Sequence, residues 1–296
     1  MSTASETLQE NAAPGLPDWF CRAMAEPGQS HFLETNENRL HYLGWNLEED
    51  HKPVLLFIHG FRGHAHWWDF IAPSFASQYR VVALDLSGMG DSEHREAYDA
   101  AAPARDILAL IEHLGSTPVI AVGHSYGGSR LLRACAERPE LFRRLIIIDS
   151  FVLFEGEPFP SEPATIRGNR VYPDLPTGMQ RFRLMPDQPM THDYLLEHIA
   201  RHSLRPCQGG YRWKFDPALP VGGAREADGE HLLRSIRCRV DYISAEKSVV
   251  VSQERARRIV THLPDGHGPV IVPEGHHHLM FDQPLTLISV LRALLA

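Results

Sequence analysis

The sequence predicts an α/β protein in which a doubly wound, mostly parallel sheet carries a mainly helical cap insertion. Two observations predict this fold. Short runs of consecutive apolar residues, typical of strands buried on both faces, alternate with stretches of helical periodicity. Such alternation implies right-handed crossovers between parallel strands. It is interrupted once, between residue 149 and about residue 236, and we interpret the interruption as an insertion.

The N-terminal region precedes this alternation. Residues 1–15 are polar, and we expect them to be disordered. Residues 17–25 have the apolar spacing of a short amphipathic helix. Residues 31–47 contain two extended stretches around a turn at Asn36 and Asn38, which predicts a hairpin.

The parallel sheet is predicted from six unalternating apolar runs. They are residues 54–58, 81–84, 119–122, 145–148, 240–243 and 270–272. Between these runs the apolar residues recur with a helical period. The predicted helices are residues 67–75, 104–114, 129–137, 253–262 and 285–295. We therefore assign residues 16–150 and 236–296 to the core.

Residues 151–235 form the predicted cap. Prolines are frequent in this segment, and one helical stretch lies near residues 194–199. Open α/β sheets bind ligands beyond the carboxyl ends of their strands, so a cap there would cover a ligand. We expect Trp213 to line the substrate pocket. The aromatic residues of the segment, which favour an apolar acyl or aryl group, are Tyr172, Phe182, Tyr211, Trp213 and Phe215.

Composition narrows the class of partner. The 296 residues are 43% hydrophobic and 22% charged, which is enough apolar content for one large domain or for a core with an insertion. A net charge of −8 and a pI of about 6.1 disfavour binding to nucleic acid or to an anionic membrane surface. We expect a cytoplasmic protein that acts on a small molecule without a cofactor. The sequence does not determine the oligomeric state and is compatible with a homodimer.

The most informative motif is Gly123-His124-Ser125-Tyr126-Gly127, which follows a predicted strand. Its glycines permit a turn too tight for most side chains, and the turn presents the Ser125 hydroxyl outside the sheet. The amide of Tyr126 would lie at a helix N-terminus, where positive partial charge collects. Ser125 is therefore the candidate nucleophile.

Four motifs together resemble those of the α/β-hydrolase fold family. They are His59-Gly60-Phe61, the loop of residues 85–92, the Gly-x-Ser-x-Gly motif and Gly275-His276-His277. The resemblance covers nearly all of the chain from about residue 31, except the cap. It implies a serine nucleophile, a histidine base and an orienting carboxylate, and it identifies the glycine-rich 85–92 loop as structural rather than nucleotide-binding. Some relatives have an aspartate at the position of Ser125 and open epoxides or haloalkanes, so serine disfavours those reactions.

The resemblance places the base after the last strand, where His276, His277 and His278 are adjacent. Histidine suits the role because its pKa lies near neutrality. Relatives often have a proline shortly after the base, and Pro284 fits this spacing for His277. Counting from Gly275 favours His276, so we rank His277 first and His276 second. Without a nearby cysteine or carboxylate cluster, the three histidines do not indicate a metal site.

The third member of the triad departs from the common family pattern. Many relatives carry an aspartate shortly after the strand that matches residues 240–243, but this chain has Ser248 there. A serine cannot carry the negative charge that an imidazolium needs. Asp149 follows the strand after the nucleophile helix, where some relatives place the acid, and it is the first candidate. Glu246 is the second.

Most of the remaining site residues follow the first parallel strand, residues 54–58. An oxyanion hole needs two N–H donors, and the resemblance assigns them to Phe61 and Tyr126. Glycine at position 60 would let the backbone approach the substrate. We interpret His59 as a structural hydrogen-bonding residue. Arg62 either lines the substrate pocket and pairs with a substrate carboxylate, or is an exposed loop residue.

These residues predict a serine hydrolase that cleaves an ester, thioester or related acyl bond of a small molecule through an acyl-enzyme. The same triad would also serve the cleavage of an amide or a C–C bond. The serine at position 248 leaves one further alternative, a non-catalytic protein that binds a small ligand under the cap.

Overall fold

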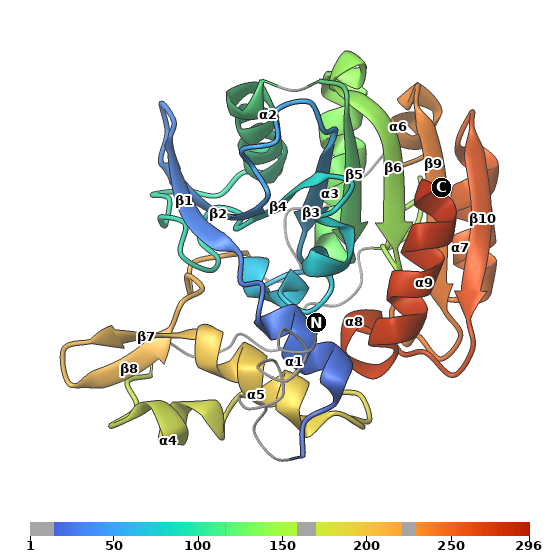
Figure 1. Cartoon of the computed structure of the whole chain (residues 1–296). Coiled ribbons are helices and arrows are strands. Elements are labelled where there is room, and N and C mark those ends of the chain that lie inside the picture. The colour runs from blue at the N-terminus through green and yellow to red at the C-terminus, as the bar shows by residue number, and fades with distance from the viewer. Residues whose placement is uncertain (1–14, 116, 159–169, 221–228) are drawn as a thin grey trace, which may run out of the picture.

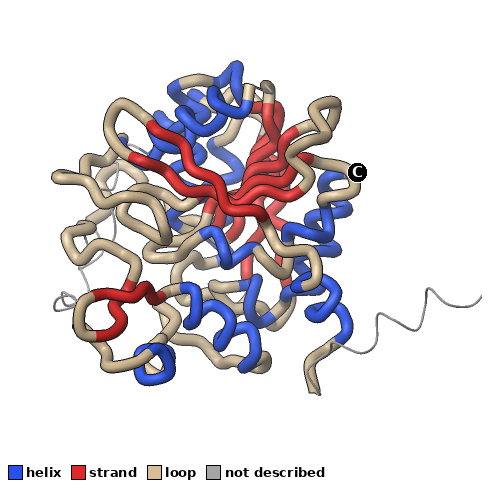
Figure 2. The backbone as a smooth tube through the Cα atoms, turned by 60° about the vertical axis from the view of Figure 1, so that its left-hand side comes forward, coloured by secondary structure: helices blue, strands red, loops and turns tan. Residues whose placement is uncertain are grey.

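The computed structural model describes residues 15–115, 117–158, 170–220 and 229–296. Its centre is a twisted eight-stranded sheet with the order β1-β2-β4-β3-β5-β6-β9-β10 (Figure 1, Figure 2). The β1–β2 and β2–β4 pairs are antiparallel, and the other neighbours in the sheet are parallel. The strands are β1 (Gln29–Glu34), β2 (Arg39–Trp45), β3 (Val54–Ile58), β4 (Arg80–Leu84), β5 (Val119–His124), β6 (Phe142–Ile148), β9 (Arg239–Ala245) and β10 (Gly266–Val272).

The predicted mostly parallel sheet is confirmed, and so is the N-terminal hairpin, which is the β1–β2 pair. The central strand β3 is completely buried, because both of its faces are covered. Leu56 and Ile58 pack with one hydrophobic core, and Leu55 and Phe57 pack with the other. An unalternating apolar run is what two covered faces require.

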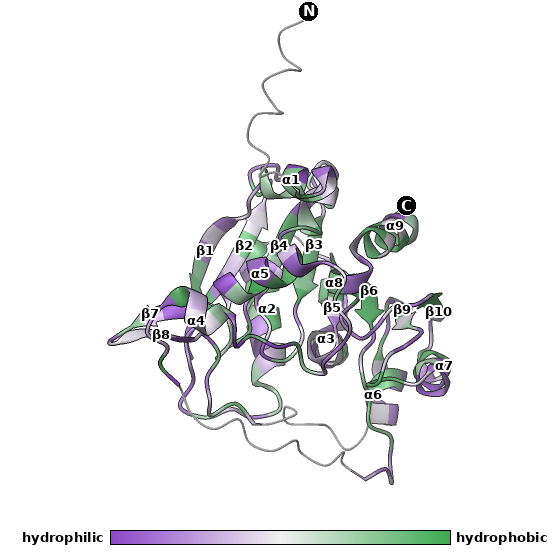
Figure 3. Cartoon of the chain, turned by 90° about the horizontal axis from the view of Figure 1, so that it is seen from below, coloured by the Kyte–Doolittle hydropathy of each residue, from purple (hydrophilic) through white to green (hydrophobic). Residues whose placement is uncertain are grey.

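Helices cover both faces of the sheet (Figure 1, Figure 2). One core takes the apolar sides of α2 (Ala102–Leu114), α3 (Tyr126–Glu137), α6 (Gly229–Ser235) and α7 (Gln253–His262). The outer side of α7 is hydrophilic (Figure 3). The other core takes α1 (Asp18–Met24), α5 (Asp193–His202), α8 (Leu279–Asp282) and α9 (Pro284–Leu295). Among the described helices, none is both long enough and apolar enough to cross a lipid bilayer.

The helix predicted over residues 67–75 is wrong. Two short 3₁₀ turns stand there, η1 (Ala65–Trp68) and η2 (Ala72–Phe75). Pro73 explains the difference, because a proline lacks the N–H that an α-helix needs and its ring clashes with the preceding turn. Helix α3 begins at Tyr126 rather than at Ser129, so Ser125 is its N-cap. A further 3₁₀ turn, η3 (Pro139–Leu141), follows α3.

Between β6 and β9 the chain forms α4 (Leu175–Met179), α5, an antiparallel hairpin of β7 (Leu204–Cys207) and β8 (Gly210–Trp213), and α6. The helices α4 and α5 and the hairpin lie beyond the carboxyl ends of the parallel strands, whereas α6 packs on a face of the sheet (Figure 1). The predicted cap is thus a mixture of helix and hairpin in its described part. Two stretches of it, residues 159–169 and 221–228, lie outside the described residues, as does the expected disorder of residues 1–14.

Candidate active site

Ser125 lies in the turn between β5 and α3, with φ of 52° and ψ of −119°. A positive φ is rare for a residue with a side chain and marks stored backbone strain. The turn is held by close backbone contacts. A Cβ atom on Gly128 would lie 2.8 Å from the Gly123 carbonyl oxygen, and one on Gly127 would lie 2.4 Å from the His59 carbonyl oxygen. Both glycines are therefore needed for the tight turn that exposes the Ser125 hydroxyl.

His277 joins Ser125 to Asp149. Its Nε2 atom lies 2.9 Å from Ser125 Oγ, and its Nδ1 atom lies 2.7 Å from Asp149 Oδ2. His277 and Asp149 are both buried. The three side chains come from the carboxyl ends of β5, β6 and β10 and form one chain of hydrogen bonds. The structure thus brings together the three residues that the sequence ranked first.

Asp149 is held in place by the neighbouring strand β9. Its amide donates to the Ile243 carbonyl oxygen over 2.9 Å, and its Oδ1 atom accepts a hydrogen bond of 3.2 Å from the Ala245 amide. Ser248 donates to Asp149 Oδ2, the oxygen that also faces His277. The serine at the common acid position therefore supports a carboxylate that comes from the adjacent strand end.

The second-ranked candidates lie elsewhere. His276 Nδ1 lies 2.8 Å from Asp282 Oδ2, so this ring turns to the start of the C-terminal helices. Glu246 is exposed, and its carboxylate accepts a hydrogen bond of 2.7 Å from the Glu274 amide. The structure brings neither residue to Ser125. The third histidine, His278, is buried and faces Gln188 at 2.9 Å.

His124 has a positioning role that sequence reasoning missed. This buried ring donates a hydrogen bond of 2.9 Å from Nε2 to the His277 carbonyl oxygen. Burial, together with the nearby His277, lowers the pKa of His124 well below its usual value, so the ring is neutral. It therefore holds the backbone of the histidine loop. The one sequence signal was a histidine at the variable position of the Gly-x-Ser-x-Gly motif.

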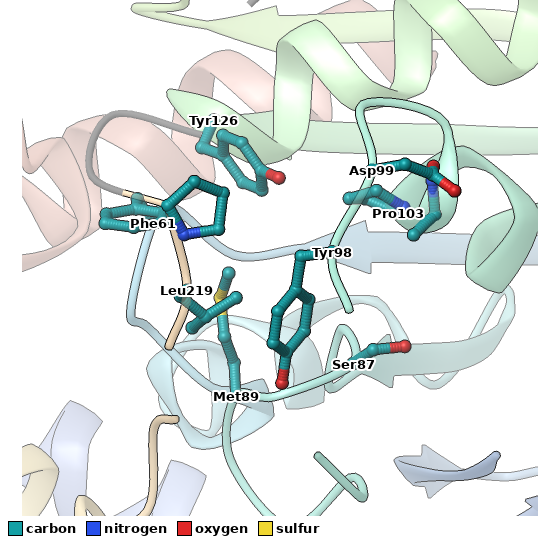
Figure 4. Close-up of a pocket in the computed structure, with 10 residues that line it drawn as sticks. Phe61, Ser87, Met89, Tyr98, Asp99, Pro103, Tyr126 and Leu219 are labelled. Carbon is teal, nitrogen blue, oxygen red and sulfur yellow. The ribbon is translucent and has the colours of Figure 1, made fainter. Parts of the chain in front are cut away.

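Two backbone amides are available beside Ser125. Within the described chain, the amides of Phe61 and Tyr126 have no hydrogen-bond partner. A Cβ atom on Gly60 would lie 3.5 Å from Ser125 Cβ, so the segment that carries Phe61 runs directly beside the nucleophile. The rings of Phe61 and Tyr126 meet edge to face, with centroids 5.5 Å apart (Figure 4). This arrangement suits an oxyanion hole.

His59 fixes the loop before Phe61. Its Nδ1 atom lies 2.7 Å from the Gly60 carbonyl oxygen, and its Nε2 atom accepts a hydrogen bond of 3.2 Å from the Leu86 amide. These partners place the proton on Nδ1. His59 therefore has the structural role that the sequence indicated.

A cavity of about 990 Å³ opens onto Ser125 and His277. Ser125, His277, Arg62 and Trp213 all line it, and most of the lining is aromatic or aliphatic. Phe61 and Tyr126 also line a second, much smaller hollow of about 10 Å³, together with Tyr98 and Leu219 (Figure 4). That volume holds no more than a water molecule. The large cavity is therefore the candidate substrate site.

Comparison with known proteins places this geometry in context. A sequence model described as "Alpha/beta hydrolase family" matches residues 55–290. A putative esterase/lipase of Haemophilus influenzae is 40% identical over 35% of this chain and 37% of its own length. Epoxide hydrolase 4 of Mus musculus is 36% identical over 38% of this chain and 31% of its own length. The chain thus spans about a third of the length of these curated relatives.

Similarity to a solved structure covers more of the chain than the similarity in sequence to these relatives. The thioesterase domain from the curacin biosynthetic pathway superposes with a TM-score of 0.73 and 24% sequence identity. The match covers 90% of this chain and 99% of that domain. The likeness therefore includes the sheet and its covering helices.

Proposed function

The chain belongs to the alpha/beta hydrolase family, and we propose that it is a serine hydrolase that cleaves an ester or thioester of a small molecule through an acyl-enzyme. One observation carries this proposal. Ser125, His277 and Asp149 form a continuous hydrogen-bonded chain, Ser125 and His277 line a large cavity, and the amides of Phe61 and Tyr126 have no hydrogen-bond partner among the described residues. A nucleophile, a base, an orienting acid and an oxyanion site are the parts that acyl transfer needs.

The geometry supports the following steps. Ser125 Oγ attacks the carbonyl carbon of the substrate while His277 Nε2 accepts the hydroxyl proton. Asp149 accepts the hydrogen bond from Nδ1 and stabilises the imidazolium. The amides of Phe61 and Tyr126 donate to the oxyanion, and His277 then passes its proton to the departing alcohol or thiol. Water repeats the sequence on the acyl-enzyme and releases the acid.

The alternative of a non-catalytic binding protein rested on the missing acid at position 248. Asp149 supplies a carboxylate 2.7 Å from the imidazole, which removes that reason. Epoxide opening in this family uses an aspartate at the elbow, and Ser125 has no carboxylate to form the corresponding ester. These points favour acyl transfer.

Labelling with a fluorophosphonate tests the proposal. We expect one phosphonylated residue per chain, located at Ser125 by peptide mass spectrometry, and no labelling of Ser125→Ala. His277→Ala should slow labelling by about 1,000-fold or more, because the hydroxyl loses its base. Ser289→Ala, which alters an exposed hydroxyl on α9, is the matched control and should label as the wild type does. A well-folded protein that never labels would contradict the proposal.

Arg62 points to the class of substrate. The sequence left open whether Arg62 is an exposed loop residue, but its side chain is only partly exposed and lines the cavity. Its guanidinium lies 4.7 Å from the Phe215 ring centroid, and no described carboxylate pairs with it. Its buried Nε atom also has no partner among the described residues. Burial lowers the pKa of Arg62.

A partly buried cation without a counter-ion is costly unless a ligand pairs with it. The Arg62 backbone also has a positive φ of 58°, a strain that functional sites often carry. We therefore propose that the acyl group of the substrate ends in a carboxylate or another anion, which binds Arg62. The aromatic wall around Trp213 would hold the apolar part of the same group.

Paired esters test this substrate class. We expect Arg62→Met to lower kcat/KM for 4-nitrophenyl hemisuccinate by about 10- to 100-fold, because hydrogen bonds to charged groups contribute about 1.5–3 kcal/mol. The neutral 4-nitrophenyl butyrate should change by less than about threefold. Arg138→Met, an exposed arginine paired with Glu112 and Glu140, controls for the lost net charge. Equal losses for both esters would refute the anionic substrate and leave the acyl-transfer proposal standing.

A further inference from the structure

A second group of chemically active side chains lies outside the catalytic cavity. We call it the His–Asp cluster, and it consists of His66, Asp69, His198 and His202. His66 lies in η1 and Asp69 directly follows it, whereas His198 and His202 lie on α5. One nitrogen or oxygen atom from each of the four residues lies within 4.8 Å of the corresponding atoms of the others. None of the four lines the cavity that contains Ser125.

The spacing of these residues follows from their secondary structure. His198 and His202 are four residues apart on a helix, so their side chains lie on one face. His66 and Asp69 are three residues apart across a 3₁₀ turn, in which side chains at that spacing align. The two faces oppose each other, although Asp69 and His198 are 129 residues apart in the chain. Four potential ligands therefore converge from two rigid elements.

The three imidazole rings of the cluster lie close to the Asp69 carboxylate or stack on a ring that contacts it. His66 Nδ1 and His198 Nε2 each lie 2.8 Å from the same atom, Asp69 Oδ2. The His202 ring stacks on His66 with centroids 3.8 Å apart. The other carboxylate oxygen, Asp69 Oδ1, is buried and has no partner among the described residues. A buried carboxylate oxygen without a donor is uncommon and needs an explanation.

We infer that the His–Asp cluster binds one divalent transition-metal ion, and that Zn²⁺ fits it best. Three imidazole nitrogens and one carboxylate oxygen form a four-coordinate set typical of zinc, and imidazole favours zinc, cobalt and nickel over calcium and magnesium. Zinc–ligand distances of about 2.0–2.2 Å place tetrahedral ligand atoms roughly 3.4 Å from one another. The pairs that are now 2.8 Å apart would therefore open slightly, and the pairs that are farther apart, up to 4.8 Å, would close in. A site with four protein ligands has a structural role rather than a catalytic one.

The metal would fasten the cap to the core. His64, two residues before the cluster, lines the cavity and lies 2.8 Å from Ser203 Oγ, at the end of α5. An ion that ties α5 to η1 would therefore also fix one wall of the substrate cavity. From the sequence we expected no metal, because the three adjacent histidines at 276–278 were the only candidate ligands with a visible pattern. Ligands so far apart in the chain show no spacing motif.

Cobalt and zinc titrations of the chelator-treated 296-residue chain test this site. We expect one Co²⁺ per chain with the visible absorption of a tetrahedral complex, displaced by Zn²⁺ with a dissociation constant of about 1 µM or tighter. Saturating Zn²⁺ should raise the melting temperature, because it binds the folded state. His202→Gln and His66→Gln should each weaken binding by about 100-fold or more.

Two variants serve as controls. His192→Gln changes a histidine on the same helix, at its N-cap and outside the cluster, and should bind Co²⁺ as the wild type does. His277→Gln should lose hydrolysis yet keep the cobalt spectrum, which separates this site from the triad. Without metal, each cluster variant should match the wild type in circular dichroism, which would show that the lost binding does not come from misfolding.

Three outcomes would overturn the inference. The first is a wild-type protein with neither a tetrahedral cobalt band nor a zinc-dependent rise in melting temperature. The second is binding that survives in both His202→Gln and His66→Gln. The third is a spectrum that disappears in His277→Gln, which would place the ion at the catalytic histidine. If the two cluster variants do not fold, the wild-type and His277→Gln measurements still decide between these outcomes.

Discussion

Asp149→Asn should lower kcat about 10,000-fold while leaving the protein folded. The amide has the size of the carboxylate but no negative charge, so it neither stabilises the imidazolium nor fixes the productive tautomer of His277. We expect the fall in kcat to reflect catalysis and not misfolding, because Asn tolerates the left-handed backbone that position 149 adopts, with φ of 45°. The measurements are kcat on an activated acyl ester and the melting temperature.

Glu246→Gln is the matched control for this prediction. Glu246 follows β9, on the side of the sheet where many relatives carry the acid, and it was the second candidate from the sequence. Its carboxylate binds the Glu274 amide rather than a catalytic group, so we expect kcat to change by less than about twofold. A large loss in Glu246→Gln together with an active Asp149→Asn would reverse the assignment.

The sequence predicted the sheet well because a parallel strand that is covered on both faces has a continuous run of apolar residues. Residues 54–58 are apolar without alternation, and they form β3 with the same limits. Helix α7 likewise has the limits that were predicted. The local sequence pattern was enough to predict an element when the burial of that element alone determines which of its residues are apolar.

The prediction failed where neighbours or backbone chemistry decide the structure. Pro73 divides residues 67–75 into two 3₁₀ turns despite their apolar spacing. The β7–β8 hairpin was missed because its strands have four residues each and pack as partly buried elements, without a clear alternation. Short segments of this kind are stabilised mainly by tertiary contacts, such as the Tyr172–Trp213 ring contact, which a local pattern does not contain.

The sequence predicted those residues of the candidate site that belong to recognisable motifs. Ser125 and the Phe61–Tyr126 pair followed from motifs, and the spacing to Pro284 ranked His277 above its neighbours. The support of Asp149 by Ser248 was not visible, because it depends on β6 and β9 being adjacent in the sheet. The His–Asp cluster was missed for the same reason, since its two halves meet only in the folded chain.

Because β6 and β9 are adjacent, the carboxylate of the triad can be transferred by substitution from position 149 to position 248. Ser248 Oγ contacts Asp149 Oδ2, and that oxygen lies 2.7 Å from His277 Nδ1. A carboxylate at position 248 is longer than the serine side chain and therefore reaches the imidazole once residue 149 is neutral. We expect the double variant Asp149→Asn/Ser248→Asp to recover about 100-fold in kcat relative to Asp149→Asn, within the range that general acid–base groups contribute.

Asp149→Asn/Ser248→Asn separates charge from shape in this experiment. Asparagine at position 248 has the size of aspartate but no charge, so it should leave kcat at the level of Asp149→Asn. Equal activity of the two double variants would show that a carboxylate at position 248 does not reach the imidazole. Recovery with aspartate alone would mean that the triad requires a negative charge at the shared end of β6 and β9, whichever of the two strands supplies it.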